Sequence, residues 1–332
     1  MGIASKNKEM QSSVKLNSNL IDISVVIPIK EEEDILPELS SRLENILTMM
    51  KLSYEVIFVT DINKDNTFEL LKEIHANNNN FKTIKLSNHS SQHIAVMAGL
   101  HVSCGNAVVI MDGDLQDYPE DIVKLYEKYQ EGYDIVYGIK ERKNDSSLRN
   151  FFSKSFKHLI NHLSDNKIDF NSNMFRIISR RTVDELSRFN EKEPATTALM
   201  SFIGFPTATV LVHSGVRLKG KTKYSYLRQI NMAISFILSF STKPLRIISF
   251  IGFIFALLSF FYLVSVVYQK LIYDLDPFGW PTLVVLVTFF GGVQLIALGI
   301  IGEYIGRIFM ETKDRPLYIV DERVGKLKDI NT

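Results

Sequence analysis

The sequence predicts an α/β protein with a mixed, mainly parallel sheet, helices on both faces, and two C-terminal transmembrane helices. Between residues 22 and 137, short apolar runs alternate with segments of helical periodicity, which is typical of βαβ units. Farther along, residues 247–267 and 278–302 contain no charged side chain. Each run is long enough to cross the apolar core of a bilayer, which takes about 20 residues.

The expected elements follow one another in strict alternation. Strands are predicted at residues 23–29, 55–60, 82–86, 107–111 and 134–138. Helices are predicted at residues 32–50, 65–76, 92–103 and 119–129. Right-handed crossovers then place helices on both faces of the sheet. Ligands of such sheets bind at the carboxyl ends of the strands, so the residues there are the first candidates for a site.

Composition narrows the function classes. The chain of 332 residues has a formal net charge of +1, which gives no reason to expect nucleic-acid binding. Its single cysteine, Cys104, excludes an intrachain disulfide. The expected organisation is a disordered tail (1–20), a catalytic domain (21–215), an interfacial amphipathic segment (216–245), two transmembrane helices (246–268 and 279–302) and a C-terminal tail (303–332).

Lysine and arginine placement predicts the orientation in the membrane. Basic residues gather before the first span and after the second, at positions Lys219, Lys221, Lys223, Arg228, Lys243, Arg246, Arg307, Lys313, Arg315 and Arg323. The connecting loop carries only Lys270. The positive-inside rule therefore places the catalytic domain and both termini in the cytoplasm, with a multi-pass anchor in the cell inner (plasma) membrane. The alternative for the two spans is a pair of buried core helices, and the alternative for the helical pattern at 222–242 is a core helix of the soluble domain.

Carboxylates follow the first, second and fourth expected strands. Glu32 and Asp61 come shortly after the first and second, and Asp112 and Asp114 directly follow the fourth. Crowded like charges are costly unless a cation offsets them. Mg²⁺ is commonly held by one or two carboxylates plus substrate phosphates, so Asp112 and Asp114 are the candidate metal ligands. Helix capping or a solvated turn is the alternative role for such residues.

Several blocks of the sequence resemble a known family. IPIKEEEDILP, YEVIFVTDINKDNT, SQHIAVMAGL and VVIMDGDLQDYPE are similar to blocks of glycosyltransferase family 2. Phe175-Arg176 and the segments at 220–224, 241–245, 302–307 and 315–320 continue the match. These later blocks resemble polyprenyl-phosphate glycosyltransferases with two transmembrane helices, the group of bactoprenol glucosyltransferases and dolichol-phosphate mannose synthases. The resemblance implies a GT-A (Rossmann-like) fold and a homo-oligomer, a tetramer.

The resemblance also implies an inverting transfer. The donor is a UDP- or GDP-sugar, with a UDP-glucose type favoured, and the acceptor is polyprenyl (undecaprenyl) phosphate. By position, Asp61 hydrogen-bonds the nucleotide base, with Pro28 and Glu32 in the same pocket. His93 follows a matched glutamine and is expected to cap or line the donor pocket.

The same resemblance assigns metal and acceptor residues. Asp112 and Asp114 hold Mg²⁺ or Mn²⁺ on the donor diphosphate, with Gln116 beside them. Arg149 and Ser153 match a pair that faces the lipid phosphate, and their i,i+4 spacing places both on one face of a helix. Asp112, Asp114 and Arg149 are therefore the expected catalytic residues. Lys140 and Arg142 precede this pair and are expected to close over the phosphates, a solvated surface position being the alternative for each.

Met174 is the main departure from the family pattern. It stands where the family usually has an aspartate, often proposed as the catalytic base, before Phe-Arg. Either the chain is an inactive relative acting as a membrane scaffold, or the base is dispensable because a phosphate monoester is mostly dianionic at pH 7. A processive polysaccharide synthase is a further alternative, but its Gln-x-x-Arg-Trp motif has no match here, since the only tryptophan is Trp280 at the membrane edge.

Overall fold

A computed structural model describes residues 21–62, 65–140, 174–189, 191, 196–213, 215, 241–273 and 279–329. The chain divides into two compact units. The first comprises residues 1–145, 169–221 and 316–332 and contains the sheet, and the second comprises residues 146–168 and 222–315 and contains two long helices. The predicted N-terminal tail lies outside the described residues.

The first unit is built on an eight-stranded sheet with the order β7-β5-β6-β4-β1-β2-β3-β8. Its strands are β1 (Ile23–Ile29), β2 (Tyr54–Thr60), β3 (Phe81–Leu86), β4 (Ala107–Ile110), β5 (Ile135–Lys140), β6 (Arg176–Ser179), β7 (Thr207–Val212) and β8 (Val320–Val324). Strands β1 to β4 pair in parallel, as do β5 and β7, whereas β6 and β8 run antiparallel to their neighbours. The predicted mixed, mainly parallel sheet is confirmed.

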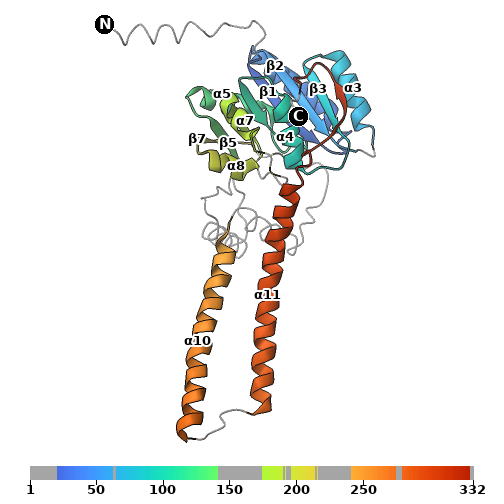
Figure 1. The fold of residues 1–332 in the computed structure, drawn as a ribbon. Coiled ribbons are helices and arrows are strands. Elements are labelled where there is room, and N and C mark those ends of the chain that lie inside the picture. Colours follow the sequence, from blue (N-terminus) through green and yellow to red (C-terminus); the bar gives the residue numbers. More distant parts are fainter. Residues whose placement is uncertain are drawn as a thin grey trace, which may run out of the picture. The chain divides into compact units, whose positions relative to one another are not determined.

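Helices cover both faces of this sheet (Figure 1). The helices of this unit are α2 (Leu36–Met49), α3 (Thr67–Asn77), α4 (Gln92–Val102), α5 (Ile122–Gln130), α7 (Arg180–Leu186) and α8 (Thr196–Ile203), with a short 3₁₀ turn at Pro119–Asp121. Each predicted strand and helix lies within a few residues of its observed position. No predicted element corresponds to β6, α7, α8, β7 or β8.

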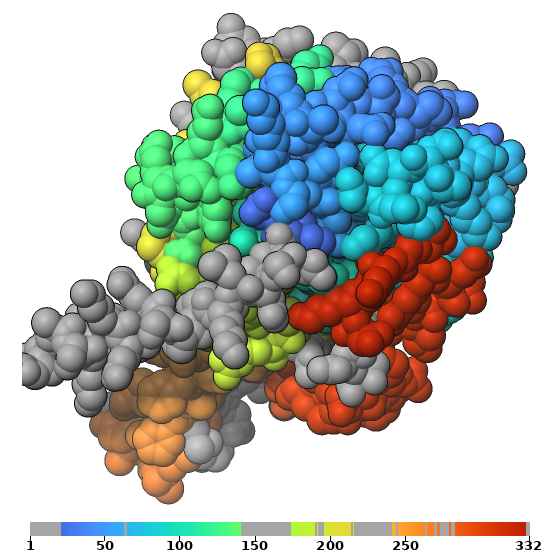
Figure 2. All heavy atoms as spheres, turned by 90° about the horizontal axis from the view of Figure 1, so that it is seen from above, coloured from blue at the N-terminus to red at the C-terminus, as the bar shows by residue number. Residues whose placement is uncertain are grey.

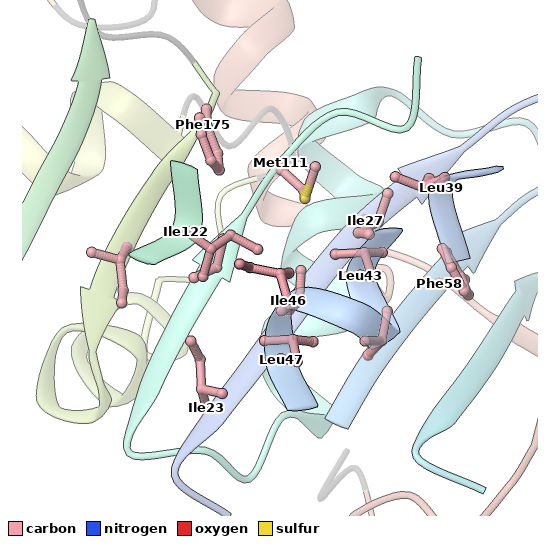
Figure 3. Packing of buried hydrophobic residues seen from close by; sticks show 14 of the residues in the cluster. Ile23, Ile27, Leu39, Leu43, Ile46, Leu47, Phe58, Met111, Ile122 and Phe175 are labelled. Carbon is pink, nitrogen blue, oxygen red and sulfur yellow. The ribbon is translucent and has the colours of Figure 1, made fainter. Parts of the chain in front are cut away.

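The core consists of one apolar layer on each face of the sheet. Alternate residues of β1 point to opposite faces, so Val25 and Ile27 join one cluster while Val26 joins the other. The first layer packs β1 and β2 against α2, as Figure 3 shows for Leu39, Leu43 and neighbouring side chains. Strands buried on both faces read as continuous apolar runs, which is why the sequence identified them readily.

Strand β8 was not expected in a segment predicted only as a C-terminal tail. It pairs antiparallel with β3, with Thr83 opposite Val324 and Lys85 opposite Glu322. Its exposed residues include Asp321, Glu322 and Arg323. Such charges on an edge strand discourage pairing with another chain, and they also hide the strand from a search for apolar runs.

The second unit contains α10 (Lys243–Tyr273) and α11 (Trp280–Thr312). Each is long and apolar enough to cross a membrane, and the apolar windows at Leu245–Tyr268 and Leu283–Thr312 are 0% buried. The alternative of buried core helices is therefore wrong. The ring of Phe255 packs edge-on against Phe289 and Phe290, so the two helices contact one another. Of the predicted interfacial segment, only Ser241 onwards lies within the described residues.

Candidate active site

The loop after β4 carries three aspartates at the carboxyl end of the sheet. Asp112 and Asp114 are partly buried, and Asp117 is 2% exposed. The carboxylate of Asp117 accepts a hydrogen bond from the backbone nitrogen of Asp112 at 3.2 Å and forms an ion pair with Lys140 Nζ at 2.8 Å. Asp117 therefore stabilises this loop from its buried side.

Two glutamine amides orient the other two carboxylates. Gln92, the first residue of α4, donates from Nε2 to Oδ1 of Asp112. Gln116 donates from Nε2 to Oδ2 of Asp114, and its backbone nitrogen donates to Oδ1 at 3.1 Å. Helix α4 begins here because Ser91 caps it, accepting from the backbone nitrogen of Ile94 at 3.4 Å. Both carboxylates are thus held in fixed directions.

Burial and like charges change the acidity of Asp112. Burial, followed by the nearby charges of Asp117 and Asp114, raises the pKa of Asp112 to about 7, while Lys140 and Arg176 oppose the shift. An excess of negative charge is therefore concentrated at this rim. Such a rim favours a bound cation.

Gly113 sits between the two aspartates with no room for a side chain. A Cβ built on it would lie 2.2 Å from Cδ1 of Ile29 and 2.5 Å from Oε2 of Glu32. The carboxylate of Glu32 therefore approaches the backbone of the Asp112–Asp114 loop. This contact joins the end of β1 to the end of β4.

Asp61 forms a second polar position, at the end of β2, and is 5% exposed. Its Oδ2 accepts from the backbone nitrogen of Ser90 at 3.1 Å and lies 3.5 Å from Nζ of Lys30 and 3.4 Å from Nδ1 of His89. Its Oδ1 is buried and has no hydrogen-bond partner among the described residues. A buried acceptor left open costs free energy, so Oδ1 is well suited to accept a hydrogen bond from a ligand.

Arg176 lies at the start of β6 and is fully buried. Its guanidinium donates to the hydroxyls of Thr196 and Thr197 at 3.3 and 3.1 Å, and to the sulfurs of Met174 and Met200 at 3.3 and 3.4 Å. Burial lowers the pKa of Arg176, and the charge of Asp112 opposes that effect. Arg176 is therefore a fixed cation within electrostatic reach of the acidic rim.

The chain is similar in sequence to known proteins. Residues 24–187 match Glycosyl transferase family 2, and residues 243–308 match the GtrB C-terminal hairpin. The uncharacterized glycosyltransferase YkcC of Bacillus subtilis is 37% identical over 309 residues, covering 93% of this chain and 96% of that protein. The chain belongs to glycosyltransferase family 2.

Two further relatives of this glycosyltransferase match over similar lengths. An uncharacterized glycosyltransferase of Synechocystis is 38% identical, covering 92% of this chain and 96% of that protein. The bactoprenol glucosyl transferase of Shigella phage SfX is 32% identical, covering 91% of this chain and 99% of that protein. The likeness therefore includes both the sheet and the apolar hairpin.

The structure brings together part of the set predicted from sequence. Asp112, Asp114, Gln116 and Lys140 lie around one loop, and Glu32 reaches it. Nδ1 of His93 lies 3.3 Å from Thr196 Oγ1, and burial and then the charge of Arg176 lower the pKa of His93. Arg142, Arg149 and Ser153 lie outside the described residues.

Some side-chain contacts at the site arise only from the fold and were not predicted. Thr196 and Thr197 begin a helix that was not predicted, and no local motif signals their contact with Arg176. Lys30 was not among the predicted site residues, yet it lies beside Asp61. The described residues contain no cluster of three or more metal-binding side chains, so a cation here would depend on two carboxylates and on oxygens of the donor.

Proposed function

We propose that this glycosyltransferase moves a sugar from a nucleoside diphosphate sugar to polyprenyl phosphate at the cytoplasmic face of a membrane. The observation that carries the proposal is the combination of two features in one chain. Asp61 offers an open buried acceptor, and the Asp112–Asp114 loop concentrates negative charge beside it along the same edge of the sheet. The named function of the phage relatives, together with the apolar hairpin, supports a lipid acceptor.

Oδ1 of Asp61 is placed to accept a hydrogen bond from the nucleobase. Uracil and guanine both present a ring N–H that a carboxylate oxygen can accept. Lys30, His89 and the backbone nitrogen of Ser90 contact Oδ2, so Oδ1 is the oxygen left without a partner among the described residues. The donor's base would then be read by one fixed acceptor.

Asp112 and Asp114 would hold Mg²⁺ or Mn²⁺ on the donor diphosphate. The surroundings of Asp112 fit this role, because a divalent cation would offset both the burial and the like charges that raise the pKa of Asp112. When bound, the metal would stabilise negative charge on the departing nucleoside diphosphate. Gln92 and Gln116 keep the two carboxylates in place before the donor arrives.

The acceptor phosphate is the nucleophile in this proposal. One of its oxygens forms a bond to the anomeric carbon as the bond from that carbon to the diphosphate breaks, with inversion at the carbon. At pH 7 the phosphate is mostly dianionic, so little proton abstraction is required and positioning supplies the catalysis. Arg149, Ser153, Lys140 and Arg142 are the proposed phosphate-binding residues.

The membrane segments bring the chain to its lipid substrate. We propose that α10 and α11 span the membrane, with residues 216–245 as an interfacial segment and both termini cytoplasmic. The basic residues at 219, 221 and 223 would lie near anionic headgroups, each contributing about 1 kcal/mol of attraction. A homo-oligomer, a tetramer, belongs to the same proposal.

One assay separates this function from its alternatives. Purified full-length protein is incubated with Mn²⁺, polyprenyl phosphate and a panel of UDP- and GDP-sugars, and the lipid fraction is analysed by mass spectrometry. A polyprenyl-phosphate monosaccharide from one donor is expected. Long glycan chains would indicate a processive synthase. The absence of both a lipid product and donor hydrolysis, with every donor tested, would indicate an inactive scaffold.

A further inference from the structure

The C-terminal segment after α11 attaches to the sheet next to the loop that surrounds Asp61. We define residues 316–324 as the C-terminal clip. Figure 2 shows the red C-terminal residues lying against the cyan part of the first unit, where β3 pairs with β8. The backbone nitrogen of Ser87, the first residue after β3, donates to the carbonyl of Ile319 at 2.9 Å.

The pairing between β3 and the clip becomes irregular where β3 ends. Lys85 lies opposite Glu322, but Leu86 lies opposite Val320, so Asp321 is the extra residue of a bulge. Bulges bend a strand and redirect the chain at the point where pairing ends. This bend lies at the last residue of β3, directly before the loop of residues 87–91 that leads into α4.

Apolar packing and a hydrogen bond hold the clip on α4. Leu317, Tyr318 and Val320 pack against the cluster that includes the buried face of this helix. The hydroxyl of Tyr318 lies 2.7 Å from Nδ1 of His101, near the end of α4. Through the neighbouring residues Tyr318 and Ile319, the clip therefore contacts both α4 and the start of the 87–91 loop.

Ion pairs attach the outer side of the clip to its neighbours. Asp321 pairs with Lys85 at 3.1 Å, and Glu322 pairs with Lys72 at 3.1 Å. These side chains are partly or largely exposed, so each pair stabilises the attachment only slightly. They are useful for a test because their replacement leaves the core intact.

The loop that the clip anchors supplies contacts to both parts of the candidate site. Ser90 and His89 hold Oδ2 of Asp61, Ser91 caps α4, and Gln92 donates to Asp112. Residues 89–92 follow closely after the end of β3 that pairs with the clip.

We propose that the C-terminal clip is a positioning element for the donor, with Tyr318 as its main positioning residue. This inference rests on the proposed nucleotide-sugar site. By fixing the start of the 87–91 loop, the clip holds Asp61 with Oδ1 open before the donor binds. A loop already ordered in its bound form loses less conformational entropy on binding, so release of the clip weakens donor binding and leaves acceptor binding unaffected.

The test uses the full chain and Tyr318→Ala, with Tyr126→Ala as the matched control on α5. A second variant combines Asp321→Arg with Glu322→Arg, which opposes Lys85 and Lys72 while preserving the core. Calorimetry measures UDP and GDP binding with Mn²⁺, and hydrogen–deuterium exchange monitors residues 87–91. The KM for polyprenyl phosphate serves as the readout that should not move.

Tyr318→Ala should weaken binding of the preferred nucleotide about tenfold, speed exchange at 87–91, and leave the acceptor KM within about twofold. The charge-reversed variant should shift both values in the same direction, and it carries the test if Tyr318→Ala does not fold. Faster exchange with unchanged nucleotide affinity, or unchanged exchange in both variants, would overturn the clip proposal. Wild-type protein that binds neither nucleotide would instead overturn the proposed function.

Discussion

Nη2 of Arg176 lies 3.3 Å from the sulfur of Met174, in the position where the family usually has a carboxylate. A thioether is a weak hydrogen-bond acceptor and carries no charge. The other described partners of this guanidinium include the hydroxyls of Thr196 and Thr197, the side chain of Tyr137 and the sulfur of Met200. The positive charge of Arg176 therefore affects the nearby site, where it opposes the rise in the pKa of Asp112.

The variant Met174→Asp tests whether the chain needs a protein base. A carboxylate at 174 would pair with Arg176, so the melting temperature should rise, while kcat should change by less than about tenfold because the acceptor is already dianionic. Met174→Leu is the control, since it removes the sulfur without adding charge. If the wild type transfers no sugar and Met174→Asp is more active by several orders of magnitude, the natural chain is an inactive relative of the family.

Asp112→Asn should lower activity and raise stability in EDTA. The pKa of Asp112 is raised from 3.8 to about 7, so ionisation of this group destabilises the folded state as pH rises between those values. An amide cannot ionise, and the metal-free variant should be more stable than wild type at pH 8, by about 2 kcal/mol after allowance for relaxation. At pH 4 the difference should disappear. Thermal melts in EDTA at the two pH values check the sign.

The activity arm of this experiment uses the same proteins. Loss of one fixed charge at the metal should reduce turnover by about 10²-fold or more. EDTA should abolish wild-type activity, and Mg²⁺ or Mn²⁺ should restore it. Full wild-type turnover in EDTA would rule out a metal role for Asp112 and Asp114.

Gly113→Ala should reduce activity more than stability. Its Cβ would meet the tips of two side chains, Ile29 and Glu32, which can move aside, but the movement displaces the Glu32 carboxylate from the loop. Gly105→Ala is the contrasting control, because its Cβ would lie 2.5 Å from the backbone nitrogen of Ser24, which cannot move aside. Gly105→Ala should therefore lower the melting temperature most. Comparison of kcat and melting temperature in the two variants separates the effects.

The sequence predicted the parallel half of the fold because its signals are local. Strands β1, β2 and β4 are largely apolar runs, and Asp61, Asp112 and Asp114 follow the last two of them within a few residues. Strand β6 has only four residues, and β7 alternates between exposed and partly buried positions along most of its length. Strand β8 joins the sheet after two long helices, so its partner Phe81–Leu86 is more than 200 residues away. A charged segment with so distant a partner gives no local signal.

Lys140 has a contact in the structure that differs from its predicted role. The resemblance places it over substrate phosphates, whereas in the structure its Nζ forms a 2.8 Å ion pair with Asp117, which is 2% exposed. Lys140→Met would leave that carboxylate buried without its cation. Breaking one side of a buried pair costs about 3 kcal/mol or more, so the free energy of unfolding should fall by that amount.

The double variant Lys140→Met/Asp117→Asn should recover most of this stability, because no buried charge remains. Lys124→Met is the matched control: Asp121 would lose a lysine at 2.7 Å but keep the backbone nitrogen and the ring of His213 at 2.7 and 2.9 Å, so the loss should be smaller. Denaturant unfolding measures all three variants, and the acceptor KM is measured beside it. If Lys140 also binds the lipid phosphate, the double variant should regain stability and retain a raised acceptor KM. Recovery of both the stability and the acceptor KM would show that Lys140 serves only the ion pair with Asp117.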